Sequence, residues 1–178
     1  MSPKEKYSLP LASLTNKIHH FKFIVNDDFF RKFPESLIQK ADIKVNLTAN
    51  KQESILLLDF SISGTVNVPC DRCSEYFDMI INGDFNLIIK SGNEFLEESE
   101  EVVIIPRNET ELDLSQYIYE FILLLIPMKI EHPDDSKGKS QCNKDLLKIL
   151  EKYKPHEKKK GEEKEIDPRW EKLKGLKG

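Results

Sequence analysis

Apolar and polar residues alternate along several long stretches of the chain. Between Asp42 and Asn50, every second residue is apolar and the residues between them are polar. A period of two is typical of a strand with one buried face. Similar alternation covers residues 19–25, 55–68, 77–89 and 102–105. The pattern therefore predicts a meander of five or six β-strands.

Two glycines interrupt the longest of these segments. Gly64 lies within 55–68, where it indicates a bulge or a close approach of two backbones, and Gly83 lies within 77–89. Long strands joined by a turn form an antiparallel ribbon, and long strands can curl strongly. We therefore expect an α+β fold: an antiparallel, strongly curled, barrel-like sheet of five or six strands, with one main packed helix and a flexible C-terminal tail.

The main helix is expected after the last strand. Asp113 is followed three residues later by Gln116, a variant of the capping box, and Pro127 ends the segment. Shorter helices are expected near residues 28–32 and 143–153. The apolar residues of the main helix recur at helical spacing and are expected to pack on the sheet: Leu114, Tyr117, Ile118, Phe121, Leu124 and Leu125.

Charge distinguishes the last part of the chain from the rest. Residues 151–178 contain 10 Lys and Arg against 7 Asp and Glu, whereas residues 1–150 contain 17 against 24. The segment 155–165 consists mainly of Lys, Glu and Gly, a composition typical of disorder. We expect a β-rich domain over 1–150 and a charged, largely disordered tail over 151–178, ending in a docking motif around Trp170.

Composition and motifs also narrow the class of function. No segment approaches the roughly 20 apolar residues of a membrane span, and Met1–Lys6 lacks the apolar stretch of a secretory signal. We find no phosphate-binding loop, nucleophile elbow or metalloprotease motif. The sequence therefore favours a cytoplasmic, non-enzymatic protein that needs neither a membrane nor a small-molecule substrate.

The candidate chemistry is concentrated in a C-x-x-C pair, Cys70 and Cys73, between the two longest strands. A structural zinc site needs four Cys or His ligands, and His132 and Cys142 would complete a set that uses all three cysteines. Reduced thiols at a turn and a redox-active pair are the alternatives. The redox interpretation is disfavoured because thioredoxin-type motifs open a helix within a βαβ unit.

Three segments carry a resemblance to a known family: residues 68–77 around the C-x-x-C pair, the helix end at 120–127 and the terminal segment 167–173. In this order along the chain they resemble motifs of the YceD family, which is named for the accumulation of large-subunit ribosomal RNA; His132 and Cys142 lie where the family often has a His and a Cys. The resemblance implies a role in accumulating or processing 23S ribosomal RNA, and so in assembling the large ribosomal subunit, with no known reaction.

Two hypotheses of function follow. In the first, the protein is a non-enzymatic assembly factor whose partner is ribosomal RNA or a large-subunit ribosomal protein. In the second, it is a protein-interaction module held together by zinc that does not contact RNA. A weakly basic tail on an acidic body is compatible with the first. Its candidate contact residues are Arg72, Lys158, Lys159, Lys160, Arg169 and Trp170.

Overall fold

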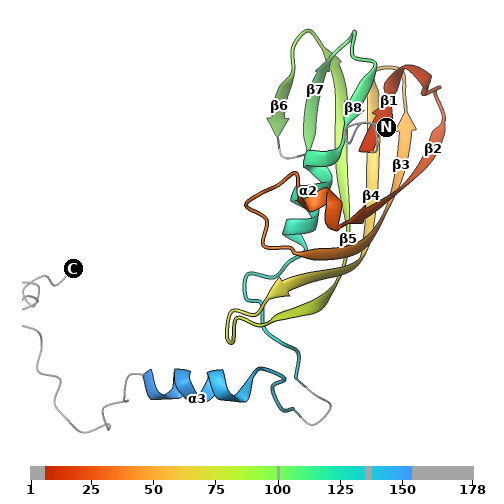
Figure 1. Cartoon of the computed structure of the whole chain (residues 1–178). Helices are drawn as coiled ribbons and strands as arrows, with labels where there is room; N and C mark the ends of the chain where they lie inside the picture. Colours follow the sequence, from red (N-terminus) through yellow and green to blue (C-terminus); the bar gives the residue numbers. More distant parts are fainter. Residues whose placement is uncertain (1–6, 100, 135–137, 154–178) are drawn as a thin grey trace, which may run out of the picture. The chain divides into compact units, whose positions relative to one another are not determined.

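The computed structural model describes residues 7–99, 101–134 and 138–153 (Figure 1). Within these ranges, strands form a large and a small sheet. The small sheet pairs β1 (Ser8–Pro10) with β8 (Glu111–Asp113) and lies next to a short 3-10 helix, Leu11–Ser13. The large sheet has the order β2-β3-β4-β5-β7-β6 and consists of β2 (Ile18–Asn26), β3 (Lys40–Lys51), β4 (Ile55–Pro69), β5 (Tyr76–Gly92), β6 (Leu96–Ser99) and β7 (Val102–Pro106).

The alternation in the sequence corresponds to the two faces of the large sheet. Every second residue of β3 from Ile43 to Ala49 is buried, and so is every second residue of β4 from Leu56 to Ile62. The residues between them face outward, and most are exposed. Burial of one apolar face is the main source of stability for such a sheet, and it confirms the strand predictions for these segments.

The expectation of an antiparallel, barrel-like sheet was wrong. The sheet is mixed, because β7 lies between β5 and β6 and pairs with β5 in parallel, from Ile88↔Val102 to Gly92↔Pro106. It is also open: β2 and β6 are its two edges and do not pair with each other. Closure is not needed to cover the apolar face, because α2 and the small sheet pack against it (Figure 1).

Two helices accompany the sheets: α1 (Asp27–Phe30) and α2 (Ser115–Leu124). Asp113 Oδ1 accepts a hydrogen bond of 2.8 Å from the Ser115 backbone N–H, satisfying one free donor at the start of α2. The ring of Phe121 stacks on that of Phe85 in β5, with centroids 4.5 Å apart. Leu124, expected on the sheet, is 71% exposed, and Ile122 is buried in its place.

A third helix, α3 (Lys144–Tyr153), belongs to a second compact unit, residues 144–178, and matches the helix expected at 143–153. Most of its large apolar residues, including Ile149 and Tyr153, are exposed, and Leu147 is half-buried. The remainder of that unit lies outside the described residues. None of the described helices combines the length and the apolar character needed to cross a membrane.

Gly64 and Gly83 lie where neighbouring groups leave no room for a side chain. A Cβ added at Gly64 would lie 2.2 Å from the backbone oxygen of Asp42 in β3, so the close backbone approach expected at Gly64 is confirmed. A Cβ at Gly83 would lie 2.3 Å from Cδ2 of Leu125, just after α2. The first obstacle is backbone held by the strand pairing, whereas the second is the end of a side chain that can rotate.

This difference predicts different costs for the two alanine substitutions. Gly64→Ala should lower the free energy of unfolding by about 3 kcal/mol, because β3 and β4 must separate locally. Gly83→Ala should lower it by about 1 kcal/mol or less, since Leu125 can change rotamer. Urea denaturation followed by circular dichroism measures both. Equal losses would contradict the rigid approach at Gly64.

Candidate metal centre

The C-x-x-C pair lies in the tight connection between β4 and β5. Pro69 ends β4, and the Cys70 backbone N–H then donates to the oxygen of Glu75 at 2.9 Å. The N–H of Ser74 donates to the oxygen of Cys70 at 2.8 Å, and Ser74 adopts a positive φ of 59°, which turns the chain into β5. These contacts form a knuckle, residues 70–75, that brings both cysteines to the same side.

A second segment, residues 130–143, follows α2 and is held against the knuckle by Asp71. The Asp71 N–H donates to the oxygen of Ile130 at 2.7 Å, and Asp71 Oδ2 accepts from the Ile130 N–H, also at 2.7 Å. This pair of hydrogen bonds fixes the backbone two residues before His132. The imidazole is thereby placed beside the cysteines.

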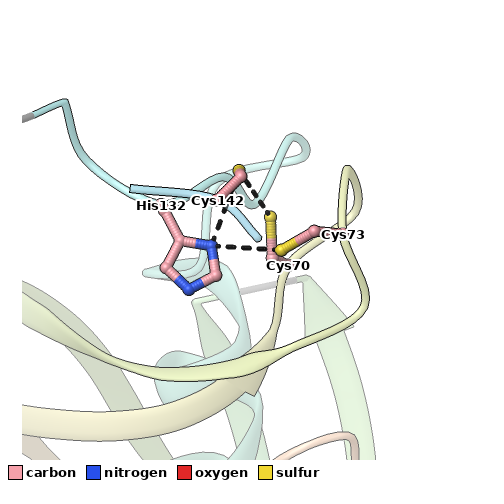
Figure 2. Close-up of side chains that lie close together, drawn as sticks. All are labelled: Cys70, Cys73, His132 and Cys142. Atoms are coloured by element: carbon pink, nitrogen blue, oxygen red, sulfur yellow. Dashed lines mark hydrogen bonds between the residues drawn. The ribbon is translucent and has the colours of Figure 1, made fainter. Parts of the chain in front are cut away.

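The four side chains expected to form a ligand set lie together (Figure 2). Sγ of Cys70 is 3.8 Å from Sγ of Cys142, and Nδ1 of His132 is 3.5 Å from Sγ of Cys73 and 3.7 Å from Sγ of Cys142. All four ligand atoms lie within 4.8 Å of one another. Three thiols and an imidazole in this arrangement could hold a metal ion.

The thiols are buried, and their surroundings move their pKa values in different directions. Burial raises the pKa of Cys70, but hydrogen bonds from knuckle backbone N–H groups and from His132 have the larger, opposite effect. Together they lower the pKa to about 6. For Cys142, the Ser140 hydroxyl lowers the pKa, but burial and the neighbouring Cys70 and Cys73 raise it overall. One thiol of the cluster thus favours the thiolate form, which is the form that binds metals.

Neighbouring side chains fix the second segment around the ligands. The His132 ring lies on the ring of Phe77 from β5, with centroids 4.4 Å apart and an interplanar angle of 30°. The Cys142 N–H donates to Ser140 Oγ at 3.2 Å, and Asn143 Nδ2 donates to Glu75 Oε1 at 2.7 Å. Contacts between protein groups therefore contribute to holding both ends of the segment 130–143 at the knuckle.

Of the predicted contact residues, the structure describes only Arg72, which lies in the knuckle with an exposed side chain and is not part of the cluster. The others lie outside the described residues: Lys158, Lys159, Lys160, Arg169 and Trp170.

Asp71 and Phe77 also position the site, a role that was not predicted for either residue. Asp71 lies between the two cysteines, which is the signal that could have suggested a role for it. Phe77 begins the segment 77–89, whose alternation predicts only a strand, and nothing in the local sequence indicates that its ring meets His132.

Comparison with known proteins identifies the family. The family model described as "Large ribosomal RNA subunit accumulation protein YceD" matches residues 58–177, which include all four residues of the cluster. Neither a curated protein nor a solved structure matches the chain. Because the match covers more than half of the sequence, the chain belongs to the YceD family.

Proposed function

We propose that the cluster of Cys70, Cys73, His132 and Cys142 binds a structural zinc ion. Tetrahedral zinc with Zn–S of about 2.3 Å and Zn–N of about 2.05 Å requires S···S distances of about 3.8 Å and S···N distances of about 3.6 Å. The distances of 3.8, 3.5 and 3.7 Å in the cluster agree with these values. This agreement is the observation that supports zinc.

The burial of the thiols favours a structural site over a redox site. Cys70, Cys73 and Cys142 are only 1%, 3% and 4% exposed, and each is a free cysteine. A thiol that exchanges disulfides must be reached by its partner, so reactive cysteines are usually at least partly exposed. Four protein ligands also leave no open position for a metal-bound water, as a catalytic zinc would need.

At the level of the cell, we propose a non-enzymatic factor in the cytoplasm that promotes accumulation of 23S ribosomal RNA and assembly of the large ribosomal subunit. Membership of the YceD family is the observation that supports this proposal. The zinc would hold the segment 130–143 on the end of the β4–β5 ribbon, where Arg72 is exposed. Arg72 and the basic residues of the tail would then supply the contacts to RNA, as Lys and Arg do with phosphates.

A second candidate is a protein-interaction module that does not contact RNA. The charge of the first compact unit favours it: residues 1–143 contain 15 Lys and Arg against 23 Asp and Glu. A net charge of −8 on this unit repels phosphate and attracts basic proteins. Pull-down of partners after nuclease treatment separates the two candidates, because only protein contacts survive removal of RNA.

We predict about one zinc ion per chain in protein purified without chelator. His132→Ala should reduce the zinc content at least tenfold, because it removes one of four ligands. Elemental analysis measures the content. His20→Ala is the matched control, since His20 lies on β2 beside Thr48 and outside the cluster, and it should retain zinc. Less than a tenth of an equivalent in the wild-type protein would exclude the site.

Cys142→Ser should loosen the second segment without unfolding the sheets. The variant protein should lose zinc, and amide hydrogen exchange at Asp71 and Ile130 should become faster. The mutual hydrogen bonds of these two residues join the segment to the knuckle. Amides of β3 and β4 should keep their protection, because their apolar face has its own core. Exchange followed by NMR tests this, and loss of protection throughout the sheet would contradict a local role.

Cells that lack the protein should accumulate less 23S ribosomal RNA and fewer large subunits. Replacing the gene with His132→Ala should reproduce part of this defect, whereas His20→Ala should behave like the wild type. Sucrose-gradient profiles and RNA quantification measure the outcome. A normal profile in the cells without the protein would refute the proposed function, whatever the zinc content.

A further inference from the structure

A groove between the sheets of the first compact unit has an apolar floor and an acidic rim. It encloses about 410 Å³, within the range of ligand-binding pockets, and lies among β6, β7, β8 and the start of α2. Its apolar walls come from Phe95, Ile105, Leu112 and Tyr117. Phe95 is 57% exposed, so a large apolar side chain of the groove faces solvent.

Four carboxylates line the same groove, with no Lys, Arg or His among its lining residues: Glu97, Glu109, Glu111 and Asp113. Glu111 accepts a hydrogen bond from Ser8, and Asp113 accepts one from the start of α2. Within the described part of the chain, Glu97 and Glu109 have neither a salt bridge nor a side-chain hydrogen bond. Like charges that line one surface repel one another, and an approaching cation relieves that repulsion.

The charge of Glu97 acts directly on the groove wall. Burial raises the pKa of Tyr117, and the carboxylates of Glu97 and Glu120 raise it further. The negative potential therefore extends over the aromatic wall. A cationic side chain entering the groove would meet carboxylates at the rim and aromatic rings on the walls, and both attract cations.

The arrangement of the carboxylates selects among classes of cationic ligand. They are not close enough to one another to form a metal-ligand group: the one such group in the described residues is the Cys–His cluster. An RNA strand would be repelled by this rim. Lys and Arg side chains fit best, because their aliphatic stems can pack on apolar walls while their charged ends reach the carboxylates.

We propose that this groove binds a Lys- and Arg-rich segment of a partner protein that also carries apolar residues. The proposal rests on the proposed function, for which it names the partner class: a basic protein of the assembling subunit rather than RNA at this surface. Charge complementarity supports the proposal, because four carboxylates surround an apolar groove. Contact with RNA is then left to Arg72 and the tail.

Fluorescence anisotropy of the full-length protein with a labelled peptide of alternating Lys and Leu, at about 50 mM salt, tests the groove. Glu97→Gln with Glu109→Gln should weaken peptide binding about fivefold, because two rim charges are lost. Phe95→Ala should weaken it by a similar factor through loss of apolar contact. The matched control is Asp59→Asn with Asp84→Asn, on the outer face of the sheet, and it should change affinity less than twofold.

Three outcomes would overturn the proposal. Equal weakening by the groove and control variants would mean that net charge alone attracts the peptide. Loss of binding to a labelled poly(U) RNA in the groove variant would place RNA there instead. Tighter peptide binding after Lys158→Gln, Lys159→Gln and Lys160→Gln would mean that the chain's own tail occupies the groove.

The two proposals fail separately. If the wild-type protein does not bind the peptide while cells without the protein still lose large subunits, the groove proposal is refuted and the proposed function stands. If the peptide binds through the groove and cells without the protein have a normal ribosome profile, the groove is a binding site and the proposed function is refuted.

Discussion

The antiparallel pairing of β4 with β5 determines where everything else in the first unit lies. The two strands pair without interruption from Ile55↔Lys90 to Pro69↔Tyr76. One end of this ribbon is the knuckle with Cys70 and Cys73, and α2 packs on its apolar face through Phe121 and Phe85. Because α2 runs across that face, the chain that follows it reaches the knuckle.

The candidate metal centre joins parts of the chain that are distant in sequence, so the fold must position most of it before any ion could bind. Cys70 and Cys142 are 72 residues apart. The two hydrogen bonds between Asp71 and Ile130, one of them to the Asp71 carboxylate, and the stacking of His132 on Phe77 hold the two parts together. An ion bound there would meet ligands that are already close, so little ordering entropy would remain to be lost on binding.

The sequence allowed prediction of those features that have a local period or a fixed count. Alternation identified β3, β4 and β5, and the three cysteines with His132 were enough to suggest the ligand set. The parallel insertion of β7 between β5 and β6 could not be predicted, because strand order depends on contacts that leave no period in the sequence. Leu124 fits the helical spacing, yet it lies on the last turn of α2, beyond the edge of the packed face. The acidic groove was missed because its carboxylates come from separate segments, and only folding brings Glu97 close to Glu109.

The two candidate binding sites of the first unit are far enough apart to act independently. The knuckle adjoins the start of β5 at Tyr76, whereas the groove is lined by Pro106, which pairs with Gly92 at the other end of β5. A strand of 17 residues is roughly 55 Å long. Substitutions so far apart, with no shared contacts, usually have additive effects on stability and binding. The contacts proposed for the two sites can therefore be made independently, one at each end of the ribbon.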